Sequence, residues 1–184
     1  MGERKVLKHI PNALTMCRFV LIPFIVGAIL EKNYIVAFIF LTISGLTDVL
    51  DGFIARKFNL VSNFGKLMDP LADKLLVISA LICMIESNLV AGWMVIIIVA
   101  RELTVSILRA IAAADGKVIA ASGGGKIKTI SQMIAIIVLL LGANLNNNLL
   151  LQIGTIFILI ATFFTLYSGI DYLYKNKDLF MNSK

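Results

Sequence analysis

The chain has 184 residues, of which 59% are apolar and 15% are charged. A soluble domain usually carries about 25% charged residues, so this composition excludes an ordinary water-soluble globular protein. The 17 basic and 11 acidic residues give a formal net charge of +6. In a membrane protein such an excess indicates orientation and contact with anionic lipids rather than nucleic acid as a partner.

Long apolar stretches predict an all-α integral membrane protein with six transmembrane helices. Their approximate ranges are 14–30, 34–55, 66–86, 89–113, 127–143 and 149–173, each near the length of a tilted membrane span. Residues 5–10 interleave basic and apolar side chains, which predicts a short N-terminal interfacial helix, with a disordered tail as the alternative. The connections are short, so residues 1–184 are expected to form a single membrane domain.

The basic residues of the connections predict the orientation in the cell membrane. Lys32, next to Glu31, is the single basic residue in the first, third and fifth connections. Because basic residues stay on the cytoplasmic side during insertion, both termini and the second and fourth connections are expected in the cytoplasm. The basic residues on that side are Arg4, Lys5, Lys8, Arg56, Lys57, Lys117, Lys126, Lys175, Lys177 and Lys184.

Four aspartates stand in or beside the second and third predicted helices. Asp48 and Asp51 are three positions apart and Asp69 and Asp73 four positions apart, so each pair shares one helix face. A carboxylate cluster would protonate or repel itself without a cation, and oxygen-only ligands suit Mg²⁺ or Mn²⁺. For Asp69 alone, the alternative is that Asp69-Pro70 only begins the third helix, as its N-cap and first-turn proline.

These aspartates belong to one string, Asp48-Val-Leu-Asp51-Gly52-Phe-Ile-Ala55-Arg56, followed after eight residues by Gly65-Lys-Leu-Met-Asp69-Pro-Leu-Ala-Asp73. The string resembles the signature of the CDP-alcohol phosphotransferases, DxxDGxxAR followed by GxxxDxxxD, at every defining position. Several positions fixed over 26 residues make a chance match improbable. Pieces outside the signature, Pro11 to Thr15 and Gly125 to Thr129 among them, resemble bacterial members that use glycerol 3-phosphate.

The resemblance implies an enzyme of phospholipid biosynthesis that transfers a phosphatidyl group from CDP-diacylglycerol to glycerol 3-phosphate and releases CMP. It implies two divalent metal ions, Mg²⁺ or Mn²⁺, which would neutralise the diphosphate. Asp48, Asp51 and Asp69 are the implied metal ligands. Asp73, at the edge of the metal site, is the implied general base. Members of the family are typically homodimers, so a homodimer is expected.

The resemblance also suggests residues for the CDP-lipid. Small residues at Gly52 and Ala55 would let the nucleotide approach the helix, although small-residue helix packing explains them equally well. Arg56 could pair with phosphate or act as a positive-inside anchor, and Asn12 could instead be a helix N-cap. The candidates for the nucleotide side are Gly52, Ala55, Arg56 and Gly65, with Asn12, Thr15 and Arg18 as weaker ones.

A second anion site is needed if the acceptor is glycerol 3-phosphate. Arg101 and Arg109 are eight positions apart, about two helical turns, so they lie on roughly one face. Arginine can bind phosphate through two hydrogen bonds. The alternative for Arg101 is a buried pair with Glu102 or with a group on another helix, and for the lysines a collar for anionic lipids. The candidates for the acceptor phosphate are Arg101, Arg109, Lys126 and Lys128.

Two other functions remain open from the sequence. The same family includes enzymes with another acceptor, namely inositol phosphate, serine or phosphatidylglycerol. Intramembrane aspartates also occur in divalent-cation transporters. A transporter needs polar groups at several depths, whereas residues 20–30 and 134–141 are almost wholly apolar. The sequence therefore favours an enzyme whose active site opens on the cytoplasmic side.

Overall fold

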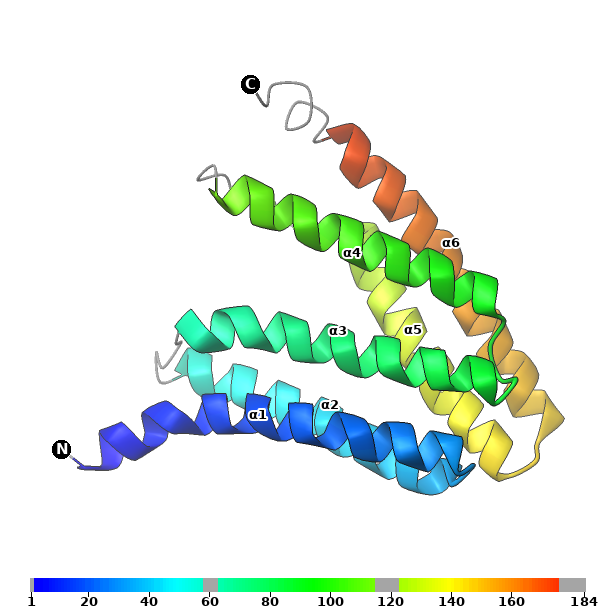
Figure 1. The fold of residues 1–184 in the computed structure, drawn as a ribbon, viewed down its shortest axis with the longest axis horizontal. Helices are drawn as coiled ribbons and strands as arrows, with labels where there is room; N and C mark the ends of the chain where they lie inside the picture. The colour runs from blue at the N-terminus through cyan, green and yellow to red at the C-terminus, as the bar shows by residue number, and fades with distance from the viewer. Residues whose placement is uncertain (1, 58–62, 115–122, 176–184) are drawn as a thin grey trace. The chain divides into compact units, whose positions relative to one another are not determined.

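The computed structural model describes the backbone of residues 2–57, 63–114 and 123–175, and the side chains of residues 15–47, 68–113 and 127–175. This part of the chain is all helical and contains no strand, which confirms the predicted all-α class (Figure 1). The helices are α1 (Gly2–Leu30), α2 (Tyr34–Lys57), α3 (Asn63–Glu86), α4 (Gly92–Ala114), α5 (Gly123–Asn144) and α6 (Asn148–Lys175).

Each predicted span coincides with one helix, and the ends differ by a few residues except at α1. The helices group into two compact units, Met1–Ser87 with α1 to α3 and Asn88–Lys184 with α4 to α6. We refer to them as the first and the second unit. That residues 1–184 form a single domain stays a prediction.

One expectation and two alternatives about helix ends are wrong. The segment 5–10 is not a separate short helix, because α1 runs without interruption from Gly2 to Leu30. Proline has a helical φ, and membrane helices tolerate its missing N–H and the clash of its ring with the carbonyl four residues earlier. Helix α1 accordingly continues through Pro11. Asn12 therefore lies inside α1 and is not its N-cap. Likewise α3 begins at Asn63 and contains Pro70, so Asp69-Pro70 does not begin the third helix.

In the first unit, α1 packs along both α2 and α3. Apolar side chains fill this unit, among them Ile25 and Ile29 of α1, Leu41 of α2 and Leu76 of α3, all at most 5% exposed. Burial of such side chains contributes about 1.5–3 kcal/mol each in water. Helix α1 is therefore the element that holds the unit together.

In the second unit, α6 packs along both α5 and α4. A tight turn joins α5 to α6, with Asn146 in the left-handed region at φ 48°. The Asn147 N–H donates to the Gly142 carbonyl at 2.9 Å, and the Asn147 side-chain oxygen accepts from the N–H groups of Leu149 and Leu150 at 3.0 and 3.2 Å. Asn147 thus caps the start of α6 and fixes the antiparallel hairpin.

The apolar side chains on the outside agree with a membrane protein. Among the described residues, Ile127–Asn144 and Asn148–Lys175 are long and apolar enough to cross a bilayer, and Thr15–Leu30 and Tyr34–Thr47 are shorter apolar helical stretches. Large apolar side chains that would be costly to expose to water face outward in both units; examples are Val20, Phe24, Ile96, Phe163 and Ile170. Lipid chains are the solvent that suits this surface.

Close packing of α5 on α6 predicts a stability effect at Gly154. A Cβ atom there would lie 2.6 Å from Leu139 Cγ and 3.2 Å from the Leu139 backbone nitrogen. Since Leu139 is 1% exposed and has no room to move away, Gly154→Ala should destabilise the protein by about 1–3 kcal/mol. Thermal unfolding in detergent measures this change.

The matched control is Gly45→Ala in α2, where a new Cβ would meet no described atom within 4 Å. Alanine favours a helix over glycine by about 1 kcal/mol, so this variant should be as stable as the parent or more so. Equal unfolding temperatures for the two variants would contradict the packing described for α5 and α6.

Candidate active site

The junction of α1 and α3 brings together four polar side chains. The Thr15 hydroxyl donates a hydrogen bond to Asp69 Oδ1, and Arg18 Nη1 donates to Asp73 Oδ1 at 2.5 Å. Arg18 Nη2 also lies 3.6 Å from Asp69 Oδ1. Residue numbers increase in the same direction on both helices, so α1 and α3 run parallel here.

Burial differs sharply between the two sides of this junction. The Arg18 side chain is 1% exposed, whereas those of Asp69 and Asp73 are 38% and 48% exposed. The positive charge is therefore enclosed and compensated, while the carboxylates reach an accessible surface. One guanidinium and two carboxylates carry a net negative charge, which favours the approach of a cation.

The carboxylate oxygens at this junction are suitable ligands for a hard divalent metal ion. Asp69 and Asp73 lie one turn apart, and carboxylate oxygens are the preferred ligands of Mg²⁺ and Mn²⁺. Asp48 and Asp51 lie in the second half of α2, and their side chains are outside the described residues. Among the residues whose side chains are described, no three potential ligands gather in one place. The predicted four-aspartate site is thus half described.

Only two of the nucleotide-side candidates, Thr15 and Arg18, have described side chains. The others are Gly52, Ala55 and Arg56 near the end of α2, Gly65 in the first turn of α3, and Asn12 inside α1. Thr15 and Arg18 contact Asp69 and Asp73, which the sequence analysis did not predict. The spacing of Thr15 and Arg18 in the sequence already indicated that they need polar partners. Two polar residues three positions apart in an apolar helix need polar partners at matching spacing on another helix.

A second polar cluster lies between α4, α5 and α6. Arg101 donates from Nη1 to Glu102 Oε1 at 3.1 Å and from Nη2 to Ser168 Oγ at 3.2 Å. Lys128, which is 5% exposed, donates to the same Glu102 Oε1. The alternative for Arg101 was a buried pair with Glu102 or with a group on another helix. The structure contains both contacts, to Glu102 and to Ser168 of α6. The sequence analysis did not assign Glu102 to the site.

Arg109 has a different environment. Its side chain is exposed, and its guanidinium carbon lies 5.8 Å from the centre of the Tyr172 ring. Tyr172 is buried with Val105 and Leu108, so it offers a fixed face for a cation–π contact. The N–H groups of the Arg109 guanidinium lie in the plane of that group and can donate hydrogen bonds to an anion. Lys126 lies in the first turn of α5, with its side chain outside the description.

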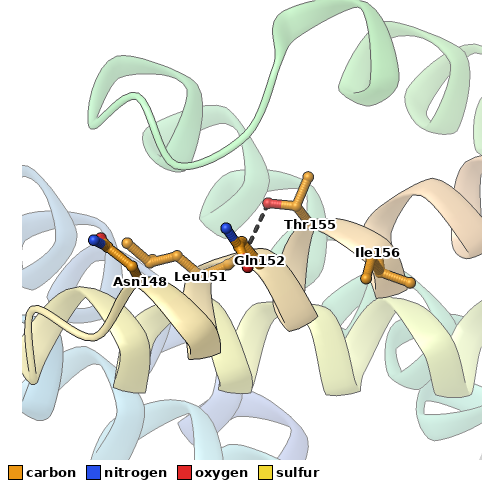
Figure 2. A pocket seen from close by; sticks show the side chains of 5 residues that line it. All are labelled: Asn148, Leu151, Gln152, Thr155 and Ile156. Atoms are coloured by element: carbon orange, nitrogen blue, oxygen red, sulfur yellow. Dashed lines mark hydrogen bonds between the residues drawn. The ribbon is translucent and has the colours of Figure 1, made fainter.

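A pocket of about 560 Å³ lies at the other end of α6 (Figure 2). The Thr155 hydroxyl donates to the Leu151 carbonyl at 2.8 Å within the helix. Neutral side chains do not provide the charge that a diphosphate needs, so this pocket does not coincide with the predicted site. Its lining residues are Asn148, Leu151, Gln152, Thr155 and Ile156.

Comparison with known proteins matches residues 8–167 to the CDP-alcohol phosphatidyltransferase family. A Bacillus subtilis protein is 41% identical over 91% of this chain and 95% of its own length. A Rickettsia felis protein is 37% identical over 94% of this chain and 98% of its own, and one from Haemophilus influenzae is 38% identical over 90% and 91%. All three are named CDP-diacylglycerol–glycerol-3-phosphate 3-phosphatidyltransferase.

The contacts of Arg18 predict a stability effect. Arg18→Lys keeps the charge, but one ammonium group lacks the planar fork that faces both carboxylates. The free energy of unfolding should fall by about 1–3 kcal/mol, the usual contribution of a hydrogen bond to a charged group. Thermal unfolding in detergent is again the measurement. Met16→Leu, at an exposed position of α1, is the control, and equal losses in both variants would argue against the junction.

Proposed function

The chain belongs to the CDP-alcohol phosphatidyltransferase family, and we propose that it transfers the phosphatidyl group of CDP-diacylglycerol to sn-glycerol 3-phosphate. The products are phosphatidylglycerophosphate and CMP. The observation that carries this function is the similarity, over nine-tenths or more of the chain, to proteins named for this reaction. Family membership decides against the transporter alternative.

The reaction exchanges one P–O bond for another. A hydroxyl oxygen of glycerol 3-phosphate forms a bond to the phosphorus that carries diacylglycerol. The bond from that phosphorus to the bridging oxygen breaks, and CMP leaves. We assign to Asp73 the acceptance of the hydroxyl proton, because a carboxylate with nearly half of its surface exposed can meet a soluble acceptor. Arg18 donates a hydrogen bond to Asp73 Oδ1 and so holds this carboxylate in one orientation.

Asp48, Asp51 and Asp69 are the proposed metal ligands, with Asp73 at the edge of the site. The family generally uses divalent metal ions, and the paired, partly exposed carboxylates of α3 support the assignment. Two Mg²⁺ or Mn²⁺ ions would neutralise the diphosphate and the charge that develops on the leaving oxygen. The Thr15 hydroxyl, bonded to Asp69 Oδ1, restricts the rotation of this ligand.

The substrates are assigned to different residues of the chain. Gly52, Ala55, Arg56 and Gly65 remain proposed for the CDP-lipid because they belong to the family signature. Asn12, Thr15 and Arg18 of α1 remain the weaker candidates. For the acceptor phosphate, the exposed guanidinium of Arg109 is the candidate with the most suitable described environment. Lys126, Lys128 and Arg101 complete the proposed set.

The proposal includes a multi-pass protein of the cell membrane with six spans. Both termini and the active site are assigned to the cytoplasmic side, on the distribution of basic residues. The helix directions within each unit agree with alternating spans: α1 and α3 run parallel, and α5 runs opposite to α6. A homodimer is part of the proposal because members of the family typically form one.

Acceptor choice is tested with purified protein in detergent, CDP-diacylglycerol and a panel of alcohols. We expect the highest kcat/KM for CMP release with glycerol 3-phosphate, compared with inositol phosphate, serine and phosphatidylglycerol. Serine has no phosphate and would leave the cations of the site unpaired, which costs orders of magnitude, whereas inositol phosphate and phosphatidylglycerol are larger than glycerol 3-phosphate and test the shape of the site. Faster release with another acceptor would overturn the proposed substrate while leaving the family intact.

Metal dependence is tested by chelation and by substitution of the α2 aspartates. Activity should vanish with chelator and return with Mg²⁺ or Mn²⁺. Asp48→Asn and Asp51→Asn keep the side-chain shape but remove its charge, so activity should fall at least about 100-fold. The control is Asp171→Asn, which removes a carboxylate paired with Lys175 at the end of α6. Full activity in chelator would refute the metal-centred reaction.

A further inference from the structure

We propose that Glu102 is a positioning residue for the acceptor phosphate: its carboxylate holds Lys128 of α5 against α4 and so sets where the cations of the second unit stand. This inference rests on the proposed function. Glu102 is 8% exposed and lies in a helix of mostly apolar residues. Such a buried acid needs an explanation, because an unpaired charge there would be costly.

The geometry makes Glu102 the shared partner of two cations. Glu102 Oε1 accepts from Arg101 Nη1 at 3.1 Å and also from Lys128 Nζ. Extended helix packing joins α6 to α4 and α6 to α5, whereas the Glu102–Lys128 pair joins α4 to α5 directly. The Glu102 carboxylate therefore contributes to the position of the Lys128 ammonium.

Glu102 is itself held in place. The Ser106 hydroxyl donates a hydrogen bond to the backbone carbonyl of Glu102 at 2.5 Å. The neighbouring Arg101 donates to Ser168 of α6, and its Cγ lies so close to Gly169 that an added Cβ would come within 3.1 Å. Helix α4 is thus held against α6 next to Glu102. Because Lys128 is hydrogen-bonded to Glu102, its ammonium group is held near the same point.

Two roles for Glu102 predict opposite effects on acceptor binding. If Glu102 only compensated charge, removing it would make the cluster more positive, attract the phosphate more strongly and lower the KM for glycerol 3-phosphate. If Glu102 positions Lys128, its loss lets this side chain turn away from the site. The KM for glycerol 3-phosphate then rises although the cluster has become more positive.

The test compares the steady-state kinetics of Glu102→Gln with those of the parent enzyme, varying each substrate in turn. We expect the KM for glycerol 3-phosphate to rise about tenfold, the effect of one lost charge-assisted contact, with the KM for CDP-diacylglycerol changed less than twofold. Glu86→Gln, at an exposed position at the end of α3, is the matched control. An unchanged or lowered KM for glycerol 3-phosphate overturns the proposal.

A second comparison separates positioning from a loss of folding. Glu102→Asp keeps the charge but shortens the side chain, so it should raise the same KM and serves as the test if Glu102→Gln does not fold. The double variant Glu102→Gln, Lys128→Met should have the same KM as Lys128→Met alone, because Glu102 acts through Lys128. Additive increases would contradict this.

The two proposals fail in different ways. If the parent enzyme releases no CMP with glycerol 3-phosphate, the proposed function fails and the acceptor role of Glu102 with it. If the parent enzyme uses glycerol 3-phosphate but Glu102→Gln leaves its KM unchanged, only the positioning role fails. A thermal shift of the purified protein with glycerol 3-phosphate gives a binding readout that does not depend on turnover.

Discussion

In each unit a buried cation on one helix pairs with a carboxylate on another helix. Arg18 of α1 pairs with Asp73 of α3 in the first unit, and Lys128 of α5 pairs with Glu102 of α4 in the second. A lone charge in an apolar helix is costly, and removing one partner of a buried pair leaves that cost uncompensated. Each pair therefore fixes two helices in register.

The pairs also decide which charged groups remain for substrates. In the first unit the cation is enclosed and the carboxylates of Asp69 and Asp73 stay partly exposed, which suits metal ions and a proton acceptor. In the second unit the carboxylate is enclosed between cations, and Arg109 stays exposed against Tyr172. The exposed charged groups described around these pairs are therefore carboxylates in the first unit and a guanidinium in the second.

The sequence predicted every helix because apolar runs of span length are a strong signal. It failed at the start of the first helix, where Pro11 was expected to separate a short interfacial helix but lies inside α1. The aspartates could be found from their spacing and resemblance. The spacing of Thr15 and Arg18 indicated a need for polar partners but could not identify them, and the contacts of Glu102 could not be predicted, because these contacts join residues 26 to 55 positions apart.

If the two substrates are bound by different charged groups, the kinetics of Arg109→Ala with each substrate varied in turn will separate them. We expect a loss of roughly 30-fold in kcat/KM for glycerol 3-phosphate, equivalent to about 2 kcal/mol for one charge-assisted bond. The KM for CDP-diacylglycerol should stay within twofold. Unchanged glycerol 3-phosphate kinetics, or an equal rise in both KM values, would show that Arg109 does not bind the acceptor selectively.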